Sequence, residues 1–185
     1  MREGTTILTL DNGYHLWTHT DNVGGKIRLL CLHGGPGGNH EYYENFAENL
    51  KDIDVQVTMY DQLGSWYSDQ PDFTKQENVD KFLKMDYFVD EIEEVRQKLG
   101  IDDFYLIGQS WGGAITQEYA LKYPKHLKGI IISSMTDNIA EYIVNINKIR
   151  EHEYSKEDLD FMKECENSGD YDDERYQKLI DKLNC

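Results

Sequence analysis

The sequence predicts an α/β protein in which a mostly parallel β-sheet is flanked by helices. Short, mostly apolar runs end at clusters of glycine or polar residues, and segments of helical periodicity lie between the later runs. Runs that are apolar throughout are typical of strands covered on both faces, as in a parallel sheet. The alternation of such strands with helices therefore favours the α/β class.

Six segments have the composition of strands. They are Thr5–Leu10, Tyr14–Thr18, Ile27–Leu32, Val55–Tyr60, Phe104–Ile107 and Gly129–Ser133. The first two are separated by the turn formers Asp11, Asn12 and Gly13, so we expect them to form a β-hairpin.

Two helices are expected between the later strands. The first covers roughly Val79–Leu99, where apolar residues recur every three or four positions and Gly100 follows as a C-terminal cap. The second begins at Ser110 and ends near Tyr123, before Pro124. From Ser134 onward the chain is charged and helical, so we expect one domain over residues 1–135 and a partial helical domain over residues 136–185.

Composition limits the possible partners and compartments. The formal net charge is −16, which disfavours binding to nucleic acid or to an anionic membrane. Cys31, Cys165 and Cys185 form no CxxC pair, and no apolar run reaches membrane-spanning length. We therefore expect a reduced, cytoplasmic protein. The hydrophobic content of 39% is low for a complete α/β protein.

The strongest motif is Gly108-Gln109-Ser110-Trp111-Gly112, which follows an apolar strand and precedes a helix rich in small residues. This setting is the one required by a nucleophile elbow, a tight turn that presents a serine hydroxyl above the sheet edge. The helix N-terminus adds partial positive charge, which stabilises a developing anion. The alternative is a glycine-rich turn with an idle serine.

A second motif, His33-Gly34-Gly35-Pro36-Gly37-Gly38, follows the Ile27–Leu32 strand. Such a loop can supply one oxyanion-hole N–H, while the other comes from the residue after the nucleophile, Trp111. We assign the loop donor to Gly35, with Gly34 as the second choice. A phosphate cradle is the alternative, although the P-loop lysine is absent. His33 is expected to hold the loop by hydrogen bonds rather than to act as a base.

A third motif, Asp61-Gln62-Leu63-Gly64-Ser65, follows the Val55–Tyr60 strand. We expect Asp61 to fix this loop rather than to serve as a catalytic acid. Trp66 and Tyr67 come next, and they either line an apolar pocket or cover the core.

Taken together, the three motifs resemble the proline iminopeptidases of the α/β-hydrolase superfamily over most of residues 25–135. The resemblance implies an α/β-hydrolase fold, no metal or cofactor, and release of N-terminal proline from short peptides with a free N-terminus. The acidic segment after Ser134 resembles the start of that family's helical cap. One departure is Trp66, where many relatives have a glycine.

By this resemblance, Ser110 would form an acyl-enzyme while Trp111 and Gly35 hold the oxyanion. Carboxylates would also have to bind the substrate ammonium group, but Glu141, Glu151 and Glu153 in the cap-like segment are expected to be solvated instead. Rival functions are an esterase or amidase on the same fold and an inactive hydrolase scaffold. An epoxide hydrolase would require an aspartate at the elbow.

No histidine suits the role of catalytic base. In this fold the acid and the histidine follow the serine along the chain, and only His126 and His152 do so here. A helix from Ser110 to Tyr123 rises roughly 20 Å, which places His126 at the opposite end of the sheet. We therefore expect a C-terminally truncated hydrolase of little activity alone, which needs a missing C-terminal segment. The Gly129–Ser133 strand would then be an exposed edge prone to aggregation.

Overall fold

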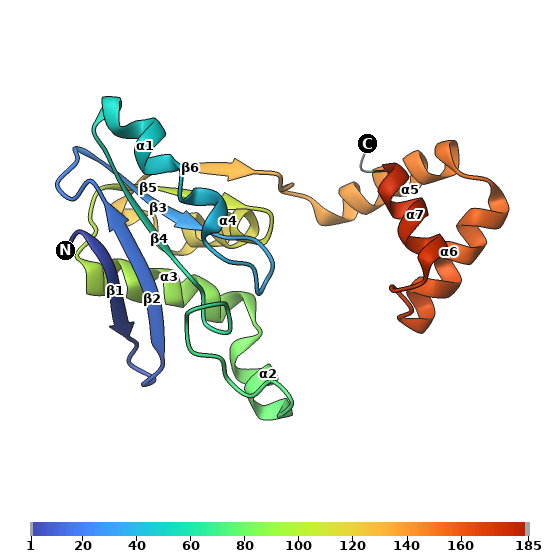
Figure 1. Cartoon of the computed structure of the whole chain (residues 1–185), viewed down its shortest axis with the longest axis horizontal. Helices are drawn as coiled ribbons and strands as arrows, with labels where there is room; N and C mark the ends of the chain where they lie inside the picture. Colours follow the sequence, from blue (N-terminus) through green and yellow to red (C-terminus); the bar gives the residue numbers. More distant parts are fainter. Residues whose placement is uncertain (1, 184–185) are drawn as a thin grey trace. The chain divides into compact units, whose positions relative to one another are not determined.

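A computed structural model describes residues 2–183 and contains one six-stranded sheet in the order β1-β2-β4-β3-β5-β6 (Figure 1). The strands are β1 (Gly4–Thr9), β2 (His15–Asp21), β3 (Ile27–Leu32), β4 (Val55–Tyr60), β5 (Phe104–Gln109) and β6 (Leu127–Ser133). β4, β3, β5 and β6 are parallel, whereas β1 and β2 are antiparallel to their neighbours. The predicted α/β class and all six strands are confirmed.

The N-terminal hairpin forms as predicted. Its register runs from Gly4 opposite Thr20 to Thr9 opposite His15, and the Leu10 N–H donates to the Tyr14 carbonyl at 2.8 Å to close the turn. β2 continues to Asp21 and pairs with β4, so it joins the hairpin to the parallel part of the sheet.

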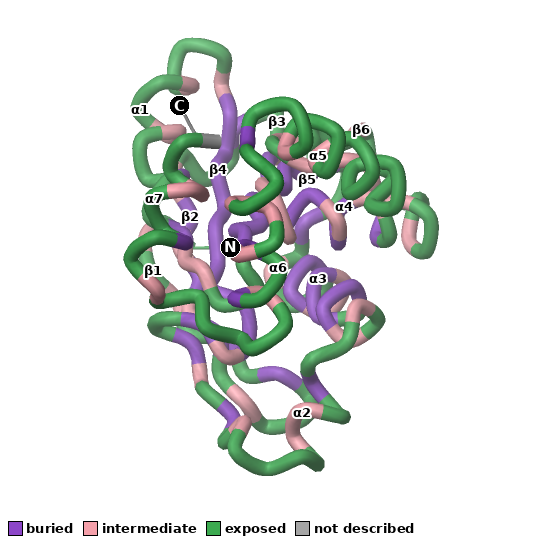
Figure 2. The backbone as a smooth tube through the Cα atoms, turned by 90° about the vertical axis from the view of Figure 1, so that its right-hand side faces the viewer, coloured by how far each residue is buried: buried purple, intermediate pink, exposed green. Residues whose placement is uncertain are grey.

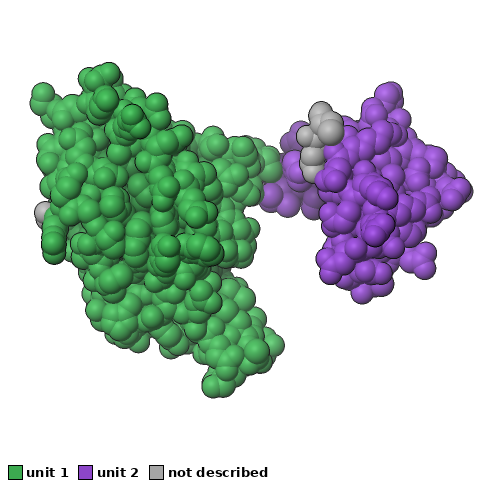
Figure 3. Space-filling view, in the orientation of Figure 1, with its two compact units in different colours: residues 1–137 green, residues 138–185 purple. Residues whose placement is uncertain are grey.

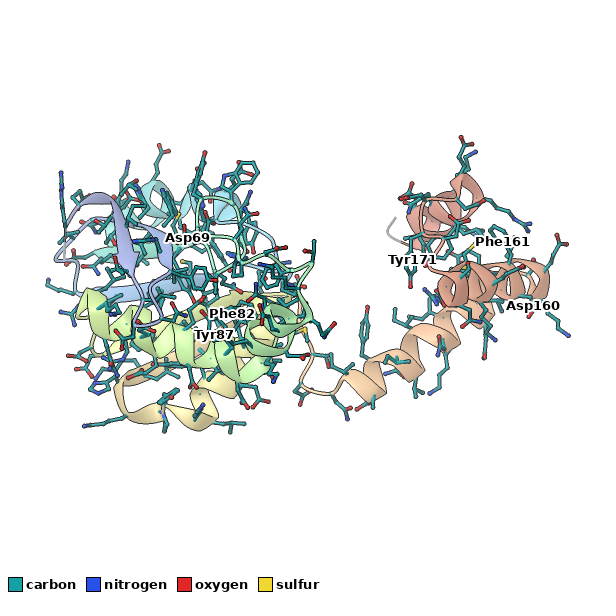
Figure 4. All side chains as sticks on the ribbon, turned by 90° about the horizontal axis from the view of Figure 1, so that it is seen from below. Asp69, Phe82, Tyr87, Asp160, Phe161 and Tyr171 are labelled. Carbon is teal, nitrogen blue, oxygen red and sulfur yellow. The ribbon has the colours of Figure 1, made fainter. Side chains whose placement is uncertain are left out.

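The single helix predicted over Val79–Leu99 is wrong, because two helices occupy this region: α2 (Gln76–Phe82) and α3 (Met85–Leu99). The backbone adopts an extended conformation at Lys84, with φ −131° and ψ 142°, although neither glycine nor proline marks the break. The turn allows the Phe82 ring to pack edge-on against Tyr87, with centroids 5.1 Å apart (Figure 4). Burial of Phe82 therefore outweighs continuation of the helix.

The hydrophobic core lies on both faces of the sheet. β4 is buried along its whole length (Figure 2). The larger core joins the sheet to α3 and to α4 (Trp111–Lys122), and Ile92, Val95 and Ile115 are fully buried there. The other face is covered by the short helix α1 (Phe46–Leu50), which the sequence analysis did not predict. Three 3₁₀ turns complete this region: η1 (Glu41–Tyr43), η2 (Lys51–Ile53) and η3 (Pro124–His126).

The chain divides into two compact units, residues 1–137 and residues 138–185 (Figure 3). The second unit contains α5 (Ile139–Glu153), α6 (Lys156–Ser168) and α7 (Glu174–Leu183), as the helical pattern predicted. Its small core is formed by Tyr154, Met162, Cys165 and Tyr176. Its assignment as a partial helical cap over residues 136–185 stays a prediction.

Two of the three cysteines, Cys31 and Cys165, are buried and unpaired, and Cys185 lies outside the described residues. Over the part of the chain that the structure describes, no helix has both the length and the apolar character needed to cross a membrane.

Candidate active site

Ser110 lies in the tight turn that joins β5 to α4. Its φ of 51° and ψ of −120° are unusual for a residue with a side chain and imply local strain. A Cβ at Gly108 would lie 2.0 Å from the Gly112 carbonyl oxygen, and one at Gly112 would lie 2.2 Å from the Leu32 carbonyl oxygen. Neither Gly108 nor Gly112 could therefore carry a side chain without a shift of the backbone.

The predicted helix start needs a correction of one residue. Ser110 is the N-cap rather than the first helical residue, and α4 begins at Trp111. The Ser110 carbonyl accepts from the N–H groups of Gly113 and Ala114, at 2.7 and 3.1 Å, while its own N–H donates to Ser133 on β6. The Trp111 N–H belongs to the first helical turn, where backbone donors have no acceptor within the helix.

The glycine loop after β3 lies directly beside the elbow. A Cβ at Gly34 would be 3.3 Å from the Ser110 Cβ and 2.4 Å from the Gln109 side-chain oxygen. The Gly34 N–H already donates to the Tyr42 hydroxyl, and the Gly34 carbonyl accepts from Gly38. Gly35 is exposed and has a φ of 128°. Of the two predicted loop donors, the hydrogen bonds therefore favour Gly35.

His33 is fully buried, and both of its ring nitrogens are engaged. Nδ1 lies 2.8 Å from the Gly34 carbonyl oxygen, and Nε2 accepts from the Gln62 N–H at 2.9 Å. A carbonyl only accepts, so the proton is on Nδ1. Burial lowers the pKa of His33, which keeps the ring neutral. His33 therefore holds two loops together, as predicted, and has no nitrogen left to act as a base.

Asp61 is likewise buried and devoted to its loop. Its Oδ1 accepts from the His40 N–H and lies 2.8 Å from the His40 Nδ1, and its Oδ2 accepts from the Tyr67 N–H at 3.3 Å. These contacts tie the loop after β4 to the segment before α1. The structure thus agrees with the loop-fixing role expected for this carboxylate.

The loop after Asp61 carries two exposed aromatic side chains. Trp66 is 52% exposed and Tyr67 is 62% exposed, so neither covers the core. Trp66 has a φ of 38°, a conformation that favours glycine. A glycine would adopt this conformation without the strain that a side chain brings.

Two contributors to the site were missed from the sequence. Gln62 is 1% exposed and hydrogen-bonds both the glycine loop and Trp111. Tyr42, in η1, accepts from the Gly34 N–H. Gln62 belongs to the motif Asp61-Gln62-Leu63-Gly64-Ser65, but nothing in the sequence indicates where its amide points.

The histidines of the first unit are not placed to accept a proton from Ser110. His40 is buried against Asp61, and His126 lies 3.0 Å from Asp102, at the opposite end of β5 from Ser110. His15 and His19 are on β2, three places from β5 in the sheet order, or roughly 14 Å at the usual strand spacing. In the second unit, His152 is exposed and pairs with Glu153. Within the described part of the first unit, Ser110 therefore has no histidine beside it.

The fold and this strand–elbow–helix arrangement define an α/β hydrolase. A family model described as the alpha/beta hydrolase fold matches residues 27–150, and the chain belongs to that family. Within it, the chain is similar to proline iminopeptidases. It is 39% identical to the enzyme of Elizabethkingia meningoseptica over 94% of this chain and 57% of that protein, and 36% identical to the enzyme of Flavobacterium johnsoniae over 90% and 55%.

Solved structures agree on the fold. The crystal structure of VinJ superposes with a TM-score of 0.81 at 26% identity, over 96% of this chain and 58% of VinJ. The proline iminopeptidase of Mycobacterium smegmatis gives a TM-score of 0.79 at 23% identity, over 97% and 59%, and this likeness concerns the fold alone. The chain thus spans a little over half the length of the relatives it matches.

Proposed function

We propose that this chain carries the nucleophile of a serine aminopeptidase that releases N-terminal proline, or another small apolar residue, from short peptides. The observation that carries the proposal is Ser110 at φ 51° between β5 and α4, beside the glycine loop. The similarity to proline iminopeptidases supports the substrate class.

In this mechanism, the Ser110 Oγ attacks the carbonyl carbon of the first residue of the peptide. The negative charge that develops on the carbonyl oxygen is held by the N–H groups of Trp111 and Gly35. Loss of one such donor raises the barrier by about 3 kcal/mol. The amine of the second residue then leaves, and water releases the acyl group from Ser110.

We also propose that residues 1–185 alone have little turnover. A histidine must take the Ser110 proton and a carboxylate must orient it, and the described histidines are engaged or placed elsewhere. Catalysis would then require these two groups from a further polypeptide segment. Without them, the chain would be the inactive scaffold that is the main alternative to the proposal.

An aminopeptidase must also bind the free ammonium group of its substrate, which requires carboxylates. Glu141, Glu151 and Glu153 are all exposed on α5, and Glu153 pairs with His152. These contacts fit the solvated roles expected for them. Free-amine recognition is therefore the feature that separates an aminopeptidase from an esterase or amidase on this fold.

The test compares proline- and alanine-anilides with an N-blocked proline anilide and with p-nitrophenyl esters. The chain is assayed alone and with the part of the Elizabethkingia meningoseptica relative that it does not match supplied in trans, since it covers 57% of that protein. We expect turnover of free-amine anilides only in the combined sample, and its loss in Ser110→Ala. Ser133→Ala is the matched control, because Ser133 contacts the elbow through its carbonyl, which the substitution keeps.

Equal turnover of the blocked substrate would rule out an aminopeptidase. Robust hydrolysis by the chain alone, abolished by Ser110→Ala, would refute the need for a second segment. His152→Ala would then be the first substitution to examine.

A further inference from the structure

We propose that Gln62 is a positioning residue that holds the glycine loop and the first turn of α4 in one fixed arrangement. The loop carries Gly35 and the turn carries Trp111, so Gln62 sets the distance between the two donors of the oxyanion hole. This inference rests on the proposed function and adds a residue to its site.

The Gln62 side chain bridges the two segments directly. Its Nε2 donates to the His33 carbonyl oxygen at 2.9 Å, and its Oε1 accepts from the Trp111 Nε1–H at 3.1 Å. His33 begins the glycine loop and Trp111 begins α4. One amide thus connects the ends of two elements that are otherwise separate in sequence by more than seventy residues.

The chemistry of the partners fixes the orientation of the amide. A backbone carbonyl can only accept and an indole N–H can only donate, so the Gln62 amide cannot flip without losing both bonds. Gln62 is 1% exposed and His33 is fully buried, so the bond between them is shielded from water, and the bond to Trp111 is part-buried. A side chain that lacks either function leaves a buried polar group unpaired.

The backbone of Gln62 reinforces this link. Its N–H donates to His33 Nε2 at 2.9 Å, and the His33 Nδ1 binds the Gly34 carbonyl at 2.8 Å. The backbone and the side chain of Gln62 therefore each form one hydrogen bond with His33, at the start of the glycine loop. A substitution at position 62 removes only the side-chain hydrogen bonds and keeps the backbone one, so the effect of the side-chain amide can be measured by itself.

The connection predicts that loss of the amide alters both donors at once. In Gln62→Met the indole N–H of Trp111 loses its acceptor and the His33 carbonyl loses its donor, while side-chain length is kept. The matched control is Gln56→Met, because Gln56 is also a buried glutamine, 3% exposed, at the other end of β4. Both changes remove a buried amide, but only the first touches the site.

The experiment is two-dimensional NMR of the isotope-labelled 185-residue chain, without substrate. We expect Gln62→Met to speed hydrogen exchange of the Trp111 indole roughly tenfold, the factor for one buried hydrogen bond, and to shift the backbone amides of both Gly35 and Trp111. Gln56→Met should leave these signals unchanged. Trp111→Phe breaks the same bond from the other side and should shift the Gly35 amide in the same way.

The proposal is overturned if a folded Gln62→Met chain keeps the Gly35 and Trp111 amide signals of the parent. If Gln62→Met does not fold, an unchanged Gly35 amide in Trp111→Phe has the same consequence. In the combined sample with a C-terminal segment, Gln62→Met should lower kcat for proline-anilide at least tenfold with little change in KM. Absence of peptidase activity in the parent sample refutes the proposed function but not the NMR result.

Discussion

Glu91 offers the sharpest test of the energetics, because it is a carboxyl group buried under the site with no cationic partner in its described contacts. The side chain is 3% exposed on α3, and its oxygens accept from the Leu63 N–H at 3.3 and 3.4 Å. Burial raises the pKa of Glu91 from 4.5 to about 8, although the bond from Leu63 opposes this. The folded protein therefore keeps Glu91 protonated at neutral pH.

The sign of the effect on stability follows from proton binding. Between pH 4.5 and about 8 the unfolded chain has lost the Glu91 proton and the folded chain has kept it. The free energy of unfolding then falls as pH rises, by about 1.4 kcal/mol per pH unit. The part of the free energy of unfolding that depends on protonated Glu91 is fully present below pH 4.5. It is lost by the time the pH reaches the pKa of Glu91 in the folded protein, about 8. From pH 5 to pH 8 the loss amounts to roughly 4 kcal/mol.

Glu91→Gln removes this titration and retains an oxygen acceptor for Leu63. We expect the free energy of unfolding of the variant, minus that of the parent, to increase by several kcal/mol between pH 5 and pH 8. This is the order of magnitude set by the difference between the Glu91 pKa in the unfolded and the folded chain. Urea unfolding followed by tryptophan fluorescence measures the difference, since all three tryptophans lie in the first unit. Comparison of the two chains cancels the titration of other groups.

Glu94→Gln is the control, because Glu94 lies on the same helix with a side chain that is 24% exposed and paired with Lys98. Any rise of its stability with pH relative to the parent should be far smaller than that of Glu91→Gln, because the Glu94 charge raises the Glu91 pKa less than burial does. A flat difference for Glu91→Gln over pH 5 to 8 would mean that Glu91 is ionised in the folded protein, and would refute the reasoning.

Four further substitutions test other parts of the first unit. Gly108→Ala should lower the free energy of unfolding by about 3 kcal/mol or more in urea titrations, because its Cβ meets a backbone carbonyl at 2.0 Å. Gly129→Ala should cost clearly less, since its Cβ meets only a side-chain ring at 3.2 Å; equal losses would contradict the geometry. Ile131→Lys on β6 should reduce aggregation measured by light scattering, because this edge residue is 46% exposed. Asp61→Ala should cost about 2–4 kcal/mol in thermal or urea unfolding, because it leaves the Nδ1 and the backbone N–H of buried His40 without their acceptor; a loss below 1 kcal/mol would speak against the loop-fixing role.

The sequence was most informative where one residue type alone satisfies the backbone. Gly108 and Gly112 could be assigned to a tight elbow because a side chain at either position collides with backbone. The strands were equally clear, since β3, β4 and β5 are short apolar runs. In such places, the local sequence and the tertiary structure impose the same requirement.

Prediction failed where tertiary packing decided between local alternatives. The break between α2 and α3 lies in a continuous apolar stripe, and only the packing of Phe82 against Tyr87 accounts for it. The role of Gln62 was missed for a similar reason. Its partners, His33 and Trp111, are brought together only when β3, β4 and β5 align, and a sequence motif does not record that alignment.

The position of Ser110 depends on the edge strand as well as on the elbow. Its strained backbone is held by the N–H bond to the Ser133 carbonyl at the end of β6, at 2.9 Å. Three consecutive isoleucines precede Ser133, and all are more than one third exposed in the first unit, so β6 has few buried contacts to restrain it. Motion of β6 would therefore reach Ser110 through this hydrogen bond and through the pairing of β6 with β5, which continues to Ser133 opposite Gln109. On the other side, Gln62 and the buried loops restrain Trp111 and the glycine loop. Buried hydrogen bonds thus hold the site on its β3–β4 side, whereas its β6 side is an exposed sheet edge, so covering that edge should have its largest effect on Ser110.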